Sequence, residues 1–264
     1  MDASIISAAS FMNHQNKMIL GGTRGHVELW SIERQSCERQ LFEHPTSGIS
    51  AVCITSTDKW LMVATLDGFL YQLNIDKGNL TKLRITKAKL LALDATDEHF
   101  ILGATDSIAY LDDKELIGHT HWVSGVGFWM NIAVTASFDR TIRTWDMKTG
   151  NPLLTMEGHT AEINSFTLVG AYAVSGSPDK TLRVWYVMDG TNLFTYPLHT
   201  NPIVAGKPFV FAAAVNKEIR FWNLCTGKPI ETKHISSKCY KLVLSPTHTM
   251  AISLRGQGVV LQMN

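Results

Sequence analysis

Short apolar runs that end in small residues recur along the chain, and each leads into a turn and then into an alternating run. One example is IAVTAS at 132–137, which is followed by a turn containing Asp139 and then by TIRTW at 141–145. Alternation with a period of two, interrupted by turn residues at about every 8–12 positions, predicts antiparallel hairpins. No segment has convincing helical spacing, so we expect an all-β chain with Gly and Pro mainly in the turns.

Two segments, residues 118–146 and 158–186, repeat one another closely. Both open with Gly-His-Thr, and they start 40 residues apart. In each segment the His precedes an Asp by 20 residues, and that Asp precedes a Trp by six. Units of about 40 residues with four short strands are typical of the blades of a β-propeller. Because one blade cannot bury both faces alone, the apolar middle strands predict radial stacking of the units.

The repeat continues outward in weaker form, and no low-complexity linker interrupts it. His44, Asp67 and Leu73 hold the marked positions upstream, and His199, Asn216 and Trp222 hold them downstream. The sequence therefore predicts a single domain over residues 1–264 with seven units. Their approximate limits are 5–44, 46–88, 89–119, 120–159, 160–199, 200–236 and 237–264.

These residues resemble the WD40 repeat family. Its motif is matched by GHT near the start of a unit, SGSPD or TASFD in the middle and TIRTWD near the end. The resemblance is strong over 118–199 and faint in the third and seventh units, and Trp145-Asp146 is the one literal Trp-Asp pair. It implies an all-β, seven-bladed WD40-type propeller.

The resemblance also implies a hydrogen-bonded tetrad inside each well-matched blade. In such a tetrad a loop His bonds a turn Asp, a second-strand Ser or Thr bonds the His, and a third-strand Trp completes the set. The implied tetrads are His119, Thr135, Asp139 and Trp145, and His159, Ser175, Asp179 and Trp185, with Ser177 as an alternative to Ser175. The second and sixth units should be held less firmly, because Leu73 cannot donate and Asn216 replaces the Asp.

Recurrence separates structural from functional candidates. A catalytic reading of His119 and Asp139 is disfavoured, because an enzyme needs one site and not a copy in each unit. Trp122 and Phe138 do not recur, and the resemblance places them near the face where partners of WD40 proteins dock. Large aromatic side chains make good anchors there, and Glu162 and Pro178 hold the equivalent positions in the next unit.

Charge gives little support to nucleic acid as a partner. Lys and Arg total 24 against 23 Asp and Glu, so the formal net charge is +1. RNA or nucleosome binding would need a basic face, which this balance does not indicate. One local run of cations, Lys82, Arg84, Lys87 and Lys89, is interpreted as a solvated edge.

No cofactor, metal site or catalytic motif is predicted. The four cysteines, Cys37, Cys53, Cys225 and Cys239, are scattered without a CxxC pair, so reduced thiols are expected. The chain shows neither a secretory signal nor an apolar run long enough to span a bilayer, so a cytoplasmic or nuclear location is expected. An enzyme site assembled from distant residues in a central channel is the remaining catalytic alternative.

The last unit ends after what reads as its third strand, so its outer strand is expected to be missing. Open edges invite pairing with another chain. One hypothesis is that a partner supplies the strand in trans. The other is that the chain is a shortened form or relative of a longer protein whose upstream segment closes the ring, such as an F-box substrate-receptor propeller.

Together these observations predict a non-catalytic scaffold or adaptor that binds proteins or peptides on its loop-bearing face, within a larger complex. A substrate-recognition subunit of an F-box-type ubiquitin ligase is the more specific alternative. A nucleic-acid-associated propeller and a channel-site enzyme are the alternatives from other classes. The sequence does not identify the partner.

Overall fold

The computed structural model describes residues 6–34, 36–198, 202–215, 217–235, 239, 241–244, 249–254 and 257–262, with the backbone alone in the last two ranges. These residues form 27 strands and no helix, as the period-two pattern predicts. The described part of the chain accordingly contains no helix that could cross a membrane.

The strands are short and follow one another through tight turns. In chain order they are β1 (Ile6–Phe11), β2 (Lys17–Gly22), β3 (His26–Ser31), β4 (Ser36–Glu43), β5 (Ile49–Ile54), β6 (Trp60–Thr65), β7 (Phe69–Asn74), β8 (Leu80–Arg84), β9 (Leu90–Ala95), β10 (Phe100–Ala104), β11 (Ile108–Leu111), β12 (Lys114–Ile117), β13 (Val123–Trp129), β14 (Ile132–Ser137), β15 (Ile142–Asp146), β16 (Pro152–Met156), β17 (Ser165–Val169), β18 (Tyr172–Gly176), β19 (Thr181–Tyr186), β20 (Thr191–Pro197), β21 (Ile203–Lys207), β22 (Val210–Val215), β23 (Glu218–Asn223), β24 (Pro229–His234), β25 (Lys241–Leu244), β26 (Thr249–Leu254) and β27 (Gln257–Gln262).

Consecutive strands pair antiparallel into separate sheets. β1–β4, β5–β8, β9–β12, β13–β16, β17–β20 and β21–β24 each form a four-stranded sheet, here called blades 1 to 6. The remaining strands, β25–β27, form a three-stranded sheet. The sequence predicts seven blades, but the structure has six complete ones, because only three strands follow β24 in the described residues. Within the described residues no further strand pairs with β27, the position at which the sequence predicts a missing outer strand.

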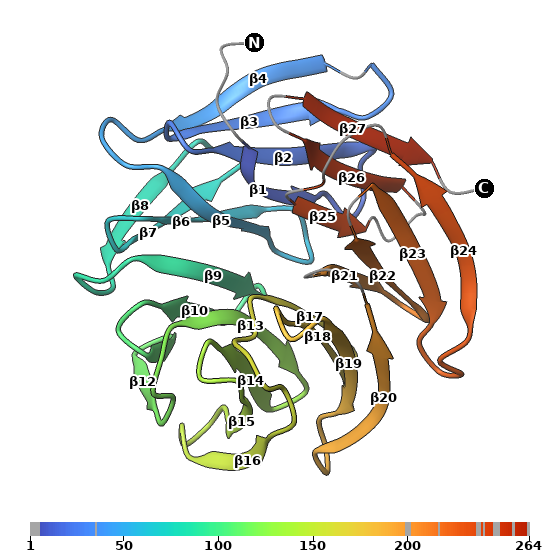
Figure 1. Cartoon of the computed structure of the whole chain (residues 1–264). Helices are drawn as coiled ribbons and strands as arrows, with labels where there is room; N and C mark the ends of the chain where they lie inside the picture. The colour runs from blue at the N-terminus through green and yellow to red at the C-terminus, as the bar shows by residue number, and fades with distance from the viewer. Residues whose placement is uncertain are drawn as a thin grey trace.

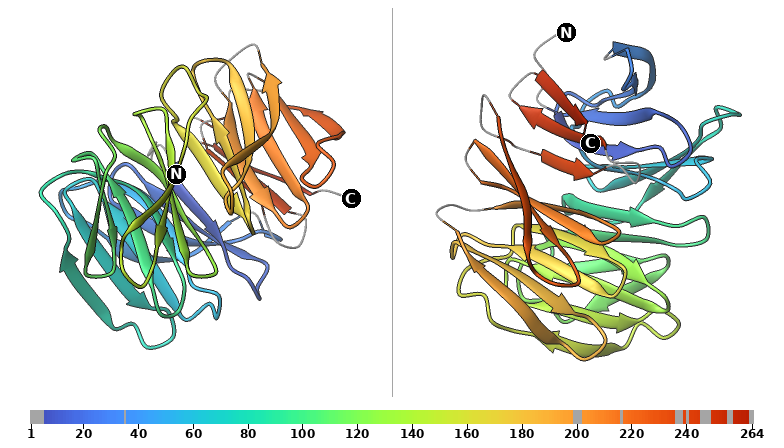
Figure 2. Two further views of the ribbon diagram at one scale, coloured as in Figure 1. Left: turned by 90° about the horizontal axis from the view of Figure 1, so that it is seen from below. Right: turned by 90° about the vertical axis from the view of Figure 1, so that its right-hand side faces the viewer.

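The sheets are arranged around a central axis as a β-propeller (Figure 1). The first strand of each sheet lies innermost and contacts the first strands of both neighbouring sheets, from β1 through β5, β9, β13, β17 and β21 to β25. β25 also contacts β1, so the ring of inner strands is continuous. The side views show the sheets packed face to face around this axis (Figure 2).

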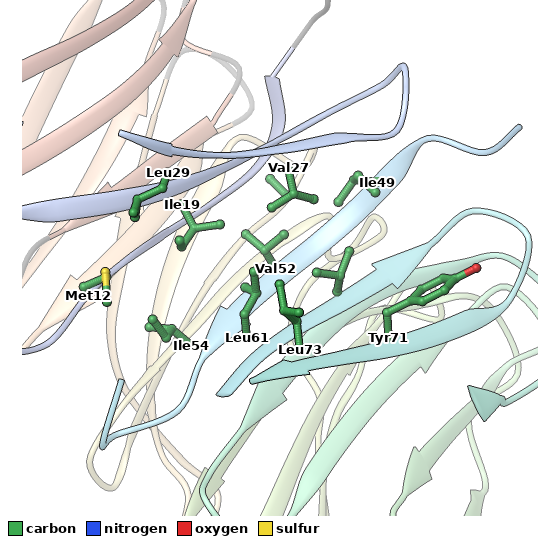
Figure 3. Close-up of a cluster of buried hydrophobic side chains, with 12 residues drawn as sticks. Met12, Ile19, Val27, Leu29, Ile49, Val52, Ile54, Leu61, Tyr71 and Leu73 are labelled. Carbon is green, nitrogen blue, oxygen red and sulfur yellow. The ribbon is translucent and has the colours of Figure 1, made fainter. Parts of the chain in front are cut away.

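The hydrophobic core is divided into clusters that lie between neighbouring sheets. Figure 3 shows one of them, where Ile19 and Leu29 of blade 1 face Val52 and Leu61 of blade 2. At the seam between the last and first sheets, Val243 packs against a cluster that contains Phe11. Each sheet thus buries apolar side chains on both of its faces, which is why its middle strands do not alternate between apolar and polar residues.

Polar side chains add ties between neighbouring blades. The carboxylate of Asp58, in the first hairpin of blade 2, accepts the backbone N–H groups of Asn13 and His14 of blade 1, each at 2.8 Å. The hydroxyls of Ser56 and Thr57 in turn donate to Asp97 of blade 3, each at 2.6 Å. These bonds lower the pKa of Asp97 to about 2. The hairpins of blades 1 to 3 are therefore linked in sequence along one end of the propeller.

Candidate functional site

The other end of the propeller carries the residues that the sequence singles out. In an antiparallel blade, the turn between the second and third strands lies at the same end as the loop that leads into the next blade. His119, Trp122 and Asp139 lie in these connections of blade 4, and His159 and Asp179 lie in those of blade 5. We call this end the tetrad face.

Blade 4 contains a complete tetrad. His119 Nδ1 lies 2.7 Å from Asp139 Oδ2, and His119 Nε2 lies 2.7 Å from Thr135 Oγ1. Trp145 Nε1 donates to the same hydroxyl oxygen at 2.9 Å. The chain of bonds links the loop, the turn and two strands of one sheet.

Donor chemistry determines the direction of these bonds. An indole N–H can only donate, so Thr135 Oγ1 accepts from Trp145. The hydroxyl proton of Thr135 is then available to His119 Nε2, and the N–H at Nδ1 points to the carboxylate of Asp139. A neutral imidazole satisfies every member of the tetrad. The tetrad therefore joins the loop and the turn to the second and third strands of the blade.

Blade 5 repeats the arrangement with Ser in place of Thr. His159 Nδ1 lies 2.7 Å from Asp179 Oδ2, and His159 Nε2 lies 2.8 Å from Ser175 Oγ. Trp185 Nε1 also donates to Ser175 Oγ at 2.8 Å. Ser177, the alternative candidate, instead accepts a bond from the backbone N–H of Asp179 at 3.1 Å. Ser175 is therefore the tetrad residue.

Burial and hydrogen bonding shift the titration of these groups. Burial raises the pKa of Asp139, but hydrogen bonds from His119, Thr141 and the backbone N–H of Thr120 outweigh burial and bring that pKa below its usual value. In blade 5 burial likewise raises the pKa of Asp179, and bonds from Thr181 and His159 bring it below 3.8. Burial lowers the pKa of His159 below 6.5 despite the bond to Asp179. Near neutral pH these shifts favour the ionised carboxylates of Asp139 and Asp179 and the neutral ring of His159.

Blade 2 keeps three of the four marks but not the tetrad. His44 Nδ1 accepts the backbone N–H of Ser47 at 2.9 Å, and His44 Nε2 lies 3.5 Å from Asp67 Oδ2. The hydroxyl of Thr65 donates to Asp67 Oδ1 at 2.6 Å and forms no bond to His44. The side chain of Leu73 has no N–H group that could donate to Thr65 Oγ1, as the indole of Trp145 does to Thr135. In the sixth unit, His199 and Asn216 lie outside the described residues, and Trp222 stacks on Phe211 at 5.2 Å.

Blade 3 has a polar cluster that the sequence did not reveal. Asp106 Oδ2 accepts hydrogen bonds from the hydroxyls of Thr86 and Tyr110, each at 2.7 Å. Burial, together with Asp106, raises the pKa of Tyr110 to about 12. The same connections are therefore tied by different residue types, which explains why spacing alone did not identify them.

An aromatic cluster stands on the tetrad face of blade 4. The rings of Trp122 and Phe138 lie 5.3 Å apart between centroids, and the backbone N–H of Phe138 donates to Trp122 O at 2.9 Å. His121 joins them, stacked on Phe138 at 5.7 Å and edge-on to Trp122 at 5.4 Å. Trp122 is 43% exposed. His121 was not predicted from the sequence, although its position between the tetrad His and Trp122 could have indicated it.

Among the described residues, the other two candidates of this face form no polar or ring contact with the cluster, although the backbone N–H of Ile163, next to Glu162, donates to Ser137 O, next to Phe138, at 3.2 Å. Glu162 and Pro178 are half-buried in blade 5. In the described part of the chain, no hydrogen bond, ion pair or ring contact joins either residue to Trp122 or Phe138. The structure thus brings two of the four predicted contact residues together.

A cavity of about 590 Å³ occupies the centre of the ring and is lined by all seven inner strands. Lys241 is the one ionisable side chain among the described residues that line it, and burial lowers the pKa of Lys241. Ser7, Ser50 and Ser124 also line the cavity, but their hydroxyls donate to backbone carbonyls. The described lining therefore contains no acid–base pair of the kind that the channel-enzyme alternative requires.

The described residues form no cluster of metal ligands, and their cysteines form no disulfide. No group of three or more His, Cys, Asp or Glu side chains lies together there in a way that could hold a metal ion. Cys37, Cys53, Cys225 and Cys239 are free thiols. Burial raises the pKa of Cys239 to about 12, so this thiol is unreactive near neutral pH.

Comparison with known families identifies the repeats. Residues 35–72, 113–146 and 150–186 match the WD40 family, described as "WD domain, G-beta repeat". The last two segments contain the two complete tetrads. This finding confirms the resemblance to the WD40 repeat family.

Two curated relatives match about half of the chain. One is the "U3 small nucleolar RNA-associated protein 21 homolog" of Schizosaccharomyces pombe, which is 29% identical over 149 residues, or 50% of this chain and 16% of that protein. Another is the "Periodic tryptophan protein 2 homolog" of Caenorhabditis elegans, which is 27% identical over 152 residues, or 53% of this chain and 17% of that protein. The matched regions span about a sixth of these relatives.

Proposed function

We propose that this chain, which contains WD40 repeats and folds as an all-β propeller, is a non-catalytic scaffold that binds a protein or peptide partner on its tetrad face. The aromatic cluster of His121, Trp122 and Phe138 carries the proposal. Blade 4 is rigidly tied by its tetrad immediately beneath this cluster, so the three rings are held in place before a partner arrives. Preorganised aromatic anchors lose little entropy on binding.

Exposure of Trp122 supports the same conclusion. A Trp side chain with 43% of its surface in water gives up much of the stabilisation that burial would provide. Packing within the blade does not require this exposure, because the equivalent loop position of blade 5 is occupied by Glu162. A partner that covers Trp122 and Phe138 recovers that stabilisation as binding free energy. In this proposal Glu162 and Pro178 form the rim of the contact.

The relatives support a place in a larger assembly. One of them is named for its association with U3 small nucleolar RNA, so we propose a subunit of a multiprotein complex in the nucleus. A cytoplasmic location has no comparable support. Neither matched relative is named as an F-box protein, so the ubiquitin-ligase alternative lacks support as well.

The three-stranded sheet suggests a second mode of partner binding. We propose that β25–β27 is the seventh blade of a single domain spanning residues 1–264 and that its open side accepts a strand in trans. Within the described residues, β27 pairs with β26 alone. An unpaired edge of this kind favours β-augmentation. Hydrogen exchange at the amides of residues 257–262 tests this mode: a partner should protect them, and unchanged exchange in the presence of the captured partner would exclude it.

The decisive experiment is affinity purification of the full chain followed by mass spectrometry, with Trp122→Ala and Phe138→Ala as variants. Met130→Ala is the matched control, because Met130 is a large apolar residue, 72% exposed, in a hairpin at the opposite end of the same blade. We expect one set of partners to be retained by the wild-type and Met130→Ala chains and lost from the other two. Retention of every partner by Trp122→Ala and Phe138→Ala would overturn the proposal.

A further inference from the structure

The outer strand of blade 2 and the loop that follows it carry four exposed cations without an acidic partner. Lys82 and Arg84 lie on β8, and Lys87 and Lys89 lie in the loop that leads to β9. Among the described residues no carboxylate forms an ion pair with any of the four, which we call the cationic row. Several cations elsewhere are paired, such as Lys17 with Glu38 at 2.8 Å. Four unpaired cations in eight residues therefore stand out in a chain whose net charge is +1.

Aromatic rings hold the first two cations in place. Lys82 Nζ lies 4.0 Å from the centroid of the Phe69 ring and 5.5 Å from that of Tyr71. Arg84 Cζ lies 4.4 Å from the same Phe69 ring. The strand register pairs Phe69 with Arg84 and Tyr71 with Lys82, so both cations extend over one face of blade 2. Cation–π contacts fix two like charges on one ring, and no anion offsets their repulsion.

The loop is held equally well. The backbone N–H of Ala88 donates to Thr86 Oγ1 at 3.1 Å, and the backbone N–H of Lys89 donates to Thr105 Oγ1 at 3.0 Å. Asp106, the carboxylate tied to this loop, already accepts hydrogen bonds from Thr86 and Tyr110. The backbone that carries Lys87 and Lys89 is therefore fixed at the end of β8, while both side chains extend into solvent.

We propose that the cationic row binds the phosphodiester backbone of a single-stranded nucleic acid. Lys82 and Arg84 are alternate residues of β8, about 6.6–6.8 Å apart along the strand, and Lys87 and Lys89 continue the positive charge into the loop that follows. A phosphodiester chain carries one negative charge on every unit and matches such a row whatever its bases are. The planar guanidinium of Arg84 suits phosphate oxygens in particular. The cationic row lies on blade 2 and the loop that follows it, whereas the aromatic cluster lies on blade 4.

The test is fluorescence anisotropy of a labelled oligouridine with the full chain, repeated from about 50 to about 200 mM salt. Four phosphate contacts predict a slope of about −2.8 for the logarithm of the affinity against the logarithm of salt concentration. The Lys82→Gln/Arg84→Gln and Lys87→Gln/Lys89→Gln variants should each halve this slope, to about −1.4. Lys148→Gln/Lys180→Gln, which removes two exposed cations from blades 4 and 5, should leave it unchanged.

A parallel arm with oligothymidine separates RNA from DNA, since both carry the proposed chemistry. A polyglutamate peptide of equal charge tests the acidic-protein alternative, and tighter binding of polyglutamate than of either oligonucleotide would overturn the proposal. So would the absence of binding at about 50 mM salt, or a slope that neither row variant changes. Because all four side chains are exposed, circular dichroism should show the wild-type fold in each variant.

Discussion

Asp139 Oδ2 lies 2.7 Å from His119 Nδ1, although the two residues are 20 positions apart in the chain. His159 and Asp179 reproduce the same separation and the same distance in the next blade. Two copies of one arrangement, each closed by a Thr or Ser and a Trp, favour a structural role in blades 4 and 5 over a single catalytic site.

Asp179→Ala should lower the free energy of unfolding by roughly 1–3 kcal/mol or more. The substitution leaves the buried ring of His159 and the backbone N–H of Thr160 without their acceptor. Asp189→Ala is the matched control, because Asp189 is exposed and accepts a backbone bond from Thr191. Thermal unfolding of both variants measures the difference. Equal melting temperatures would contradict the assignment of Asp179 to a tetrad.

Thr135→Val should be more destabilising than Thr65→Val. In blade 4 the change removes the partner of Trp145 Nε1 and of His119 Nε2 within a fully buried site, at roughly 2–4 kcal/mol. In blade 2, Thr65 bonds to Asp67 and to Phe69 O, and no indole depends on it, so we expect about 1 kcal/mol. Urea denaturation gives both values. A larger loss in Thr65→Val would show that the blade 2 arrangement is the stronger one.

Acidification should destabilise the propeller in two stages. The pKa of His159 is lowered in the fold, so below pH 6.5 the unfolded chain binds a proton that the folded chain does not, and stability falls. The pKa of Asp179 is also lowered, so a second loss begins as pH falls through 3.8. Each such proton contributes at most about 1.4 kcal/mol per pH unit.

The His159→Gln variant isolates the first stage. It should be less stable than the wild-type chain at neutral pH, yet its melting temperature should decline less steeply between about pH 7 and pH 5. Differential scanning calorimetry across this range provides the comparison. Parallel pH profiles for the two chains would mean that His159 does not contribute to the acid sensitivity.

Asp58 should stabilise the contact between blades 1 and 2 through its bonds to the backbone N–H groups of Asn13 and His14, and we call this contact the Asp58 latch. Asp58→Gly and Asp58→Ala both remove the acceptor for the N–H groups of Asn13 and His14, so those amides should exchange hydrogen faster. Asp58 has a φ of 57°, which Gly adopts freely and Ala does not. Asp58→Ala should therefore be about 1 kcal/mol less stable than Asp58→Gly.

Exposed Asp76 lies in another turn of blade 2 and provides the control for the latch. Asp76→Ala should leave the exchange of the Asn13 and His14 amides as it is in the wild-type chain. If Asp58→Gly preserved their protection, the latch would not exist.

Residue spacing was enough to predict much of this protein. The recurrence of His, Asp and Trp at 119, 139 and 145, and again 40 residues later, predicted the all-β propeller, and the resemblance to the WD40 family implied the members of two tetrads. Such marks are readable because each blade is a local unit: its strands are consecutive, and its polar partners lie within about one repeat of one another. The period also predicted seven units, of which six form complete four-stranded blades.

Other features were decided only by tertiary structure. They are the features that depend on contacts between blades or on the orientation of a side chain. His44 matches the motif in sequence, yet without an indole at position 73 to orient Thr65 it accepts a backbone N–H at Nδ1 and faces Asp67 through Nε2, with no bond to Thr65. The aromatic cluster includes His121, and the latch at Asp58 joins residues more than 40 positions apart; neither has a signature in spacing. From the sequence, Lys82 and Arg84 were interpreted as a solvated edge, whereas the structure places both cations over the ring of Phe69. A repeat pattern encodes which residues share a blade, whereas ring stacking, cation placement and contacts between blades depend on distances that arise only when the sheets pack together.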